Sequence, residues 1–366
     1  MSSTIVREQV LAFRVRAQQL DRESGTLADT AVLDAGVQDT GPDGALWALA
    51  IRGVDVASLD PADLAVVWTL RGAPHAYRRA DLPSVAAAVE PFSEADAGKR
   101  IFDASRPLRE AGIGNREALD AVAAAMGSIV DRPMVKGEVS TRLTAVMDPP
   151  YLRFCRPCNA THLYEMPFRL AALRAGLELQ AGTSPPVLRA IPGFRRQDRP
   201  AVEHEVVRGS LRLLGPVTPK QVAEFVDAPV RDVRSRWPDD AVEVSVDGET
   251  RWVLDADRSR LTAGPARVTR LLGPFDLFLQ ARDRRLIVRE PDRAKALWPV
   301  LGRPGAVLVD GEIVGTWRPR ASGRSLRVGV EPWTAWTPRQ RTAVAEQAER
   351  LASHRGVRLA GVDGLD

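Results

Sequence analysis

Two short segments on either side of Asp247 and Gly248 constrain the fold of this 366-residue chain more than any other feature. Residues 241–246 (AVEVSV) and 249–254 (ETRWVL) alternate between apolar and polar side chains, which is the period of a strand with one buried face. An Asp-Gly pair between such segments favours a two-residue hairpin turn, because both turn positions need a positive φ. The sequence therefore predicts a two-stranded antiparallel hairpin.

Three helical segments precede this hairpin. Residues 202–214 have the spacing of an amphipathic helix. Residues 218–221 (TPKQ) form a capping box, with Thr at the N-cap, Pro in the first turn and Gln at the third helical position. Residues 230–237 place Val and Trp on one face of a short helix. Three helices followed by a hairpin are typical of a winged helix, which we predict over residues 201–262.

The third of these helices carries arginines on its polar face. In a winged helix this element enters the major groove of DNA while the hairpin touches the backbone. We therefore expect phosphate contacts from Arg231, Arg234, Arg236 and, in the hairpin, Arg251. Of the 51 basic residues four are Lys and 47 are Arg, although the net charge is only +4. Arg suits phosphate recognition, and the codon usage of a GC-rich genome is the alternative explanation of the excess.

The fold class that these patterns predict is α+β, with a β-rich C-terminal portion, and the first and second segments could each be a degenerate copy of the winged helix. Within the first part, residues 32–37 have the pattern of a short buried strand. The other predicted parts are a first winged-helix-like segment at 1–91, a second at 92–180 with helices at 116–130 and 164–175, a linker at 181–200 rich in Pro, Gly and Arg, and a β-rich domain with a terminal helix at 263–366.

The chain has no segment that predicts membrane insertion. No apolar run approaches the roughly 18 residues of a membrane helix, and the first ten residues lack the apolar core of a signal peptide. We therefore expect a cytoplasmic protein without a membrane partner, associated with the nucleoid if it binds DNA. No long coiled-coil or dimerisation helix is evident, so we expect a monomer.

The two cysteines lie close together. Cys155 and Cys158 are separated by two residues, and His162 follows after three more, which is a spacing found in metal sites. A structural zinc held by these three residues needs a fourth ligand, for which Glu165 and His204 are candidates. The alternative is a pair of half-buried thiols without a metal.

Three sequence blocks, together with the winged helix, resemble one known family. The blocks are GVQDTGPDGALWALAIR at 36–52, WTLRGAPH at 68–75 and VDGEIVGTWR at 309–318. They resemble the AlkZ-like family of bacterial DNA glycosylases over nearly the whole chain. The resemblance implies a fold of tandem winged-helix motifs with a β-rich C-terminal portion. The resemblance implies hydrolysis of the N-glycosidic bond of alkylated or crosslinked purines in double-stranded DNA, with no cofactor required for catalysis.

The resemblance also implies where catalysis takes place. The family signature is Gln-x-Gln or Gln-x-Asp, and this chain has Gln38, Asp39 and Thr40 at that place. The Gln38 amide can hold a water beneath the anomeric carbon, and Thr40 can orient water but cannot deprotonate it at neutral pH. Asp39 would be the base if a bulge turned it inward. No lysine lies near this block, which argues against a Schiff-base lyase.

Arg71, His75 and Arg318 complete the predicted contacts with DNA. Arg71 and His75 belong to a predicted hairpin, where a cation could hold a phosphate beside the lesion. Arg318 ends the third of the blocks that carry the resemblance. A second function remains open at this point, which is a non-catalytic winged-helix DNA-binding protein that acts as a regulator or as a resistance factor sequestering lesions.

Overall fold

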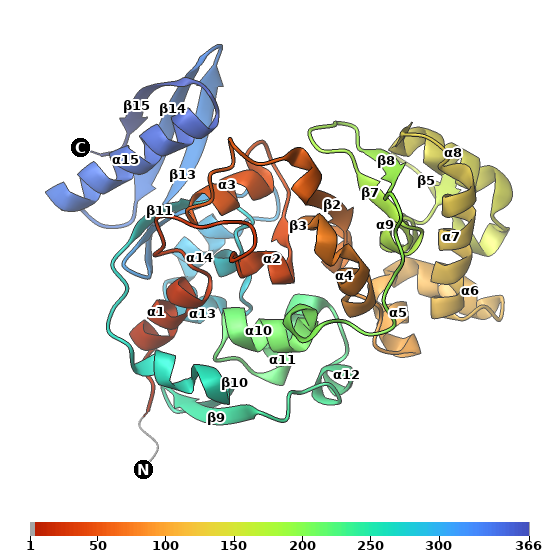
Figure 1. The fold of residues 1–366 in the computed structure, drawn as a ribbon, viewed down its shortest axis with the longest axis horizontal. Helices are drawn as coiled ribbons and strands as arrows, with labels where there is room; N and C mark the ends of the chain where they lie inside the picture. Colours follow the sequence, from red (N-terminus) through yellow and green to blue (C-terminus); the bar gives the residue numbers. More distant parts are fainter. Residues whose placement is uncertain (1–3, 366) are drawn as a thin grey trace. The chain divides into compact units, whose positions relative to one another are not determined.

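The computed structural model describes residues 4–365 and divides into two compact units (Figure 1). The first comprises Met1–Leu59, Gly209–Gln221 and Pro238–Asp366, of which residues 1–3 and 366 are not described. The second comprises Asp60–Arg208 and Val222–Trp237. The α+β class is confirmed, but these units differ from the predicted five-part division. The predicted winged helix at 201–262 is shared between them.

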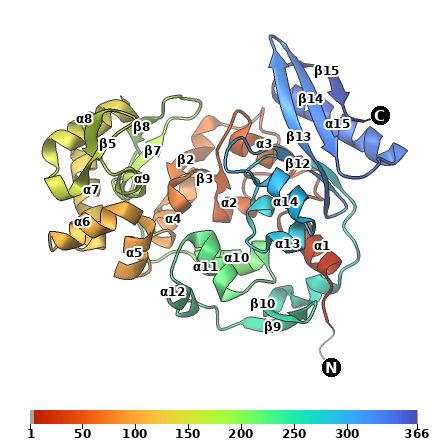
Figure 2. The same cartoon turned by 180° about the vertical axis from the view of Figure 1, so that it is seen from behind.

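A five-stranded sheet forms the C-terminal part of the first unit, in the order β11-β12-β13-β14-β15. Its neighbours are antiparallel except for β14 and β15, which are parallel. Figure 2 shows helix α15 (Pro338–His354) along one face of this sheet. The side chains of Val344 and Leu351 in this helix are fully buried. The strands are β11 (Thr269–Leu272), β12 (Gly305–Val309), β13 (Glu312–Ser322), β14 (Ser325–Pro332) and β15 (Arg358–Asp363).

The N-terminal part of the first unit corrects one prediction. Residues 32–37 are not a strand, because Val32–Ala35 form helix α2 and only Val37–Gln38 form strand β1. Gly36, at φ 81°, ends the helix and turns the chain. A short apolar run does not by itself distinguish a helix from a buried strand. The remaining helices of this unit are α1 (Arg7–Ala17), α3 (Gly44–Ala50), α13 (Arg284–Ile287) and α14 (Pro291–Leu297), with 3-10 helices η7 (Asp255–Thr262) and η8 (Leu277–Gln280).

The elements predicted for the winged helix are present in the expected order. They are α10 (Val206–Leu214), α11 (Pro219–Val226), α12 (Val230–Arg234), β9 (Ala241–Val246) and β10 (Glu249–Leu254). Strands β9 and β10 pair antiparallel, with Asp247 at φ 48° and Gly248 at φ 86° in the turn, so the hairpin is confirmed. The capping box is also confirmed, because the amide of Gln221 donates to Thr218 Oγ1 at 3.2 Å and that of Thr218 to Gln221 Oε1 at 2.9 Å.

The second unit contains a sheet in which strands follow the order β3-β2-β7-β8-β4. Its strand β8 (Val187–Ala190) lies inside the segment predicted to be a linker. Leu188, fully buried between Leu179 of β7 and Met134 of β4, gives this strand its place in the core. The Pro residues around it are typical of loops, so the sequence pattern did not predict this strand of four residues. The other strands are β2 (Leu64–Trp68), β3 (Pro74–Arg78), β4 (Met134–Val135) and β7 (Leu177–Leu179).

Helices surround this sheet, and the helices predicted at 116–130 and 164–175 are confirmed as α7 and α9. Their apolar faces join a core that includes Trp68, Leu119 and Phe168. No helix in residues 4–365 is both long and apolar enough to cross a membrane. The helices are α4 (Leu82–Ala88), α5 (Glu94–Arg100), α6 (Ser105–Glu110), α7 (Asn115–Ile129), α8 (Lys136–Val146) and α9 (Glu165–Arg174), and β5 (Leu152–Cys155) and β6 (Ala160–Leu163) form a separate hairpin.

Arginines are buried in ion pairs inside the first unit. Arg14 is fully buried and its two terminal nitrogens donate to the carboxylate of Asp283 at 2.9 and 2.7 Å. Arg52 is 1% exposed, and its two terminal nitrogens donate to the carboxylate of Asp276 at 2.8 and 2.9 Å. Burial alone would raise the pKa of Asp283, but the charges and hydrogen bonds of Arg14 and Arg251 bring it below its ordinary value. These pairs are part of the core.

Candidate active site

A cavity of about 550 Å³ opens in the first unit beside Gln38. Four stretches of chain line it, which are the Gln38 block with the start of α3, the loop after β11, the loop before β12 and the middle of β13. Trp47 and Trp317 form part of the lining, and their indole nitrogens donate to the successive carbonyls of Leu271 and Leu272 in β11. These bonds fix both rings against the sheet, so the wall of the cavity is held in place.

Gln38 and Thr40 both line the cavity and contact each other. Gln38 ends strand β1, and its Nε2 donates to Thr40 Oγ1 at 3.1 Å. A hydroxyl that accepts this bond still has its own proton to donate. The pair therefore offers a side-chain carbonyl and a hydroxyl on one side of the cavity, both able to hold a water.

Asp39 lies outside the cavity lining. Its Oδ1 accepts a hydrogen bond from the amide of Ala45 at 2.9 Å and so satisfies one of the free N–H groups at the start of α3. A Cβ at Gly44 would lie 2.0 Å from this oxygen, so glycine is needed there. The inward rotation that would make Asp39 a base is not found, because its carboxylate is engaged in capping the helix.

Two carboxylates do line the cavity, and both are engaged with arginines. Asp43 receives hydrogen bonds from Nε and Nη2 of Arg355. Asp276 is 3% exposed and held by Arg52. Neither ion pair could be predicted from the sequence, because Arg355 and Arg52 are far from these acids along the chain. Neither carboxylate is placed as a free base.

Cationic and apolar side chains surround the cavity opening. Arg318, predicted as a DNA contact, lines the cavity and is exposed. Arg303, which the sequence did not single out, also lines the cavity, and its guanidinium lies 5.4 Å from the centre of the Phe275 ring. Val300 and Leu301 in the loop before β12 are 94% and 85% exposed. Large apolar side chains this exposed next to a cavity indicate a contact surface.

His75 is not the surface cation that the sequence suggested. It is 2% exposed, and its Nδ1 lies 2.9 Å from both Thr69 Oγ1 and the carbonyl of Ala73. Burial, helped by the charge of Arg71, lowers the pKa of His75 to about 3. The ring is therefore neutral at physiological pH. Arg71 itself donates to the carbonyl of Phe225 and stacks over its ring at 5.1 Å.

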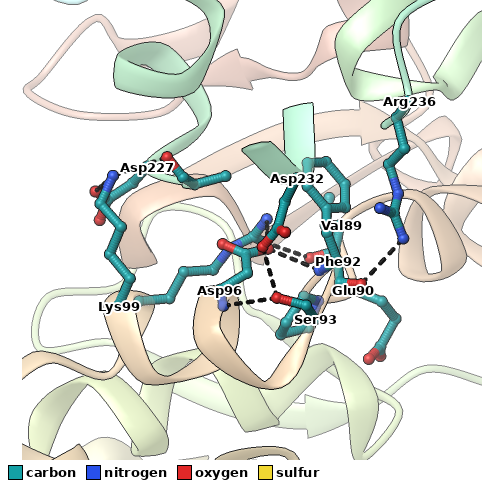
Figure 3. A network of polar contacts seen from close by, with 12 residues as sticks. Val89, Glu90, Phe92, Ser93, Asp96, Lys99, Asp227, Asp232 and Arg236 are labelled. Atoms are coloured by element: carbon teal, nitrogen blue, oxygen red, sulfur yellow. Dashed lines mark hydrogen bonds and ion pairs between the residues drawn. The ribbon is translucent and has the colours of Figure 1, made fainter. Parts of the chain in front are cut away.

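A polar network holds helix α12 against α5 within the second unit (Figure 3). Ser93 Oγ donates to Asp232 at 2.5 Å and accepts from the amide of Asp96 at 3.1 Å. Lys99 donates to the carbonyl of Ala228 at 2.9 Å, two residues before the start of α12. Arg236 packs its guanidinium 4.4 Å from the centre of the Phe92 ring and donates to the Phe92 carbonyl at 3.0 Å. The network fixes the helix that carries the predicted DNA contacts.

The four arginines predicted around α12 and the hairpin differ in their surroundings. Arg231 and Arg234 are exposed on α12, and Arg231 lies 3.4 Å from Asp232. Arg236 is exposed but packed on Phe92, as described above. Arg251 is 6% exposed and ion-paired with Asp283, inside the fold instead of on a surface that could face a phosphate. Its place in the hairpin is as predicted, but its side chain points to the core.

Cys155, Cys158 and His162 come together on the β5–β6 hairpin. Their ligand atoms lie within 4.8 Å of one another. Neither predicted fourth ligand joins them, since Glu165 is bound by Lys136 and Arg169, and His204 is bonded to Ser84 Oγ at 2.8 Å. The hydrogen bonds of Cys155 with the Cys158 backbone and with His162 lower the pKa of its thiol to about 7.

The fold, the Gln38 block and the aromatic cavity together define the class of this protein. The family model of AlkZ-like DNA glycosylases matches residues 28–354, so the chain belongs to that family. Among solved structures it is similar to the Streptomyces sahachiroi DNA glycosylase AlkZ, with 22% sequence identity, a TM-score of 0.72 and 99% of both chains covered. No curated protein matches the chain.

Proposed function

We propose that the chain hydrolyses the N-glycosidic bond of purines in double-stranded DNA that carry a positive charge through alkylation at N7 or N3. The observation that carries this proposal is the Gln38–Thr40 pair in the wall of a cavity with aromatic and cationic neighbours. Its volume of about 550 Å³ is within the range of roughly 300–1,000 Å³ that small-molecule sites occupy.

The chemistry of the substrate fits a site without a free carboxylate. An alkylated purine is already cationic, so it leaves as a neutral base without being protonated by an acid. The water oxygen forms a bond to C1′ while the C1′–N9 bond breaks, its electron pair neutralises the purine, and the proton that the water loses passes to solvent. The protein then needs to position the water and stabilise charge, more than to transfer protons.

Gln38 and Thr40 have separate roles in this mechanism. The Gln38 carbonyl accepts a hydrogen bond from the water and so directs its oxygen toward C1′. Thr40, which accepts from Gln38 Nε2 at 3.1 Å, fixes the rotamer of the amide and can donate its own proton to the water. Neither group deprotonates water at neutral pH, so the proposed rate enhancement is mainly due to positioning.

The side chains around the cavity opening support the binding of DNA. Arg303 and Arg318 supply positive charge for phosphates on either side of a lesion. The exposed Val300 and Leu301 form an apolar tip that can press against the sugars or between base pairs, as apolar wedges of minor-groove proteins do. We also propose that the protein acts as a monomer on chromosomal DNA at the nucleoid.

Single-turnover excision of 7-methylguanine from a duplex tests the proposal. Abasic sites are cleaved with alkali and quantified on a denaturing gel. We expect the wild-type protein to produce them, and Gln38→Ala to lower the rate about a hundredfold, as the loss of a single transition-state contact does elsewhere. Gln197→Ala, at an exposed position of the second unit, is the matched control and should keep the wild-type rate.

Two results would overturn the proposal in different ways. Binding of methylated duplex by the wild-type protein without any abasic product would favour the alternative of a non-catalytic DNA-binding protein. If the rate of excision is the same in Gln38→Ala as in the wild type, the protein is a glycosylase but Gln38 is not part of its active site.

A further inference from the structure

The β5–β6 hairpin gathers three soft metal ligands in a part of the fold that the proposed excision does not use. In the hairpin register Cys155 pairs with Ala160, and Arg153 pairs with His162. Cross-strand partners share a face of a two-stranded sheet, so Cys155 and His162 lie diagonally on the same face. The turn brings Cys158 back toward them through Asn159, at φ 50°. All three ligand atoms are then within 4.8 Å of one another.

The imidazole of His162 is oriented as a metal ligand usually is. Its Nδ1 lies 2.8 Å from the carbonyl of Leu163, which accepts the ring proton. With the proton on Nδ1, the lone pair is on Nε2. Ligating histidines almost always have such a backbone or carboxylate acceptor for their other nitrogen, which fixes the tautomer and the ring.

From this arrangement we propose that Cys155, Cys158 and His162 bind one zinc ion. Two thiolates and an imidazole are the donor set that Zn²⁺ prefers, whereas Mg²⁺ and Ca²⁺ take oxygen ligands. Two thiolates also neutralise the charge of the ion, so the loaded site has no net charge.

The site has three protein ligands within the described residues. No fourth His, Cys, Asp or Glu in residues 4–365 belongs to the group. The nearest acid along the chain, Glu165, accepts hydrogen bonds from Lys136 at 2.6 and 2.9 Å and is not free to turn toward the sulfurs. Cys158 is exposed, so water has access to the fourth position of a tetrahedral ion.

A metal at this place would stabilise the hairpin. Strands β5 and β6 have four residues each, and an isolated hairpin of this size is marginally stable. A bound ion links the end of β5 and the turn to His162 in β6, and so holds the two strands together at the turn end of the hairpin. The role we infer is structural, and it is independent of the glycosylase proposal.

Metal analysis of the full chain tests the inference. The protein is purified in reducing buffer without metal-affinity resin or chelator, and metals are measured by mass spectrometry. We expect about one zinc per chain in the wild type, as for other thiolate sites, and about one tenth of that or less in Cys155→Ser and Cys158→Ser. Thr161→Ala, exposed on the other face of the hairpin, should keep the metal.

Cobalt and thiol measurements keep the test decisive if a cysteine variant does not fold. Co²⁺ added to the chelator-treated wild type should give thiolate-to-cobalt charge-transfer bands, and His162→Gln should weaken them. Both thiols should react slowly with a disulfide reagent until chelator is added. Wild-type protein with no zinc and no cobalt bands would overturn the inference. A Cys155–Cys158 disulfide that persists in the reducing buffer would also overturn it.

Discussion

At the scale of single residues, the candidate site has an amide and a hydroxyl where its reaction would favour a carboxylate. Gln38 and Thr40 could be predicted from their sequence block, and the structure brings both into the cavity wall. The carboxylate of Asp39 accepts a hydrogen bond from the backbone at the start of α3 and is not available as a base. The sequence missed Asp43, because its salt bridge depends on an arginine more than 300 residues further along the chain. Partners that are distant in sequence leave no local pattern to find.

Thr40→Asp should raise the excision rate. An aspartate keeps an oxygen that can accept from Gln38 and adds a negative charge that stabilises a sugar cation and can take the water proton. We expect a gain of about tenfold in single-turnover rate, a modest value for general-base catalysis. The measurement is the 7-methylguanine assay at several pH values, and the gain should disappear near pH 4 as the new carboxyl is protonated.

Thr40→Asn provides the control, because it has the shape of Asp without its charge. If Asn and Asp variants are equally fast, charge at this position is irrelevant to the reaction.

His75 should make the second unit sensitive to acid. Its pKa is about 3 in the folded protein and 6.5 in an unfolded chain, so between these values the unfolded state binds one more proton. The stabilisation is complete above pH 6.5 and is lost as the pH falls toward 3, with a slope of about 1.4 kcal/mol per pH unit. Urea unfolding of His75→Gln between pH 3 and 6.5 should show a free energy of unfolding whose slope against pH is smaller than that of the wild type by about this amount.

Tyr77→Phe is a suitable comparison for the histidine variant. It disturbs the same buried group, because Tyr77 OH lies 3.1 Å from Thr69 Oγ1, but it does not change titration below pH 7. It should lower stability at every pH and keep the acid slope. An unchanged slope in His75→Gln would show that the ring is protonated in the folded state.

At the scale of elements, the sequence predicted the features that depend on local chemistry. The hairpin turn at Asp247 and Gly248 has the positive φ angles that the dipeptide favours. Helix α11 begins at Pro219, inside the predicted capping box. Strand β8 was missed because it has only four residues and because its pairing with β4 joins segments more than 50 residues apart. Short elements that are fixed by tertiary pairing lack a pattern of their own.

The loop before β12 should contribute to lesion binding through its two apolar side chains. Val300 and Leu301 are almost fully exposed, so Ser at both positions should change the free energy of unfolding by less than about 0.5 kcal/mol. Affinity for methylated duplex, measured by fluorescence anisotropy, should fall at least about tenfold, since burial of even one such side chain is worth about 1.5–3 kcal/mol.

Val146→Ser is the matched substitution in the second unit, at an apolar residue that is 63% exposed. It should leave the affinity unchanged. Equal effects of both variants would mean that the loop has no particular role in binding DNA.

At the scale of the whole molecule, the 47 arginines serve two purposes. Some lie on the surface, such as Arg231, Arg234 and Arg318, where they can meet phosphates. Others, such as Arg14 and Arg52, are buried against carboxylates and hold the first unit together. Composition predicted only the first purpose, because a count of arginines does not show which of them have acidic partners in the core.

The salt dependence of DNA binding should separate these two groups. Each surface arginine replaced by Ala should reduce the slope of log K against log salt by about 0.9, if it neutralises one phosphate. Arg251→Met should leave the slope unchanged and lower the free energy of unfolding by about 3 kcal/mol, because Asp283 loses one of its two cations. A changed slope in Arg251→Met protein that is still folded would place this residue on the DNA surface.

The cavity is built from parts of the chain that the ribosome makes at very different times. Gln38 and Trp47 are made early, whereas Arg303 and Trp317 follow more than 250 residues later. Most of the second unit, Asp60–Arg208, emerges between them and has its own core to fold around. During synthesis the first unit cannot complete its fold until the C-terminal sheet has been made, because its N-terminal helices pack against that part of the chain. In a nascent chain the proposed excision site is therefore incomplete until translation is nearly finished.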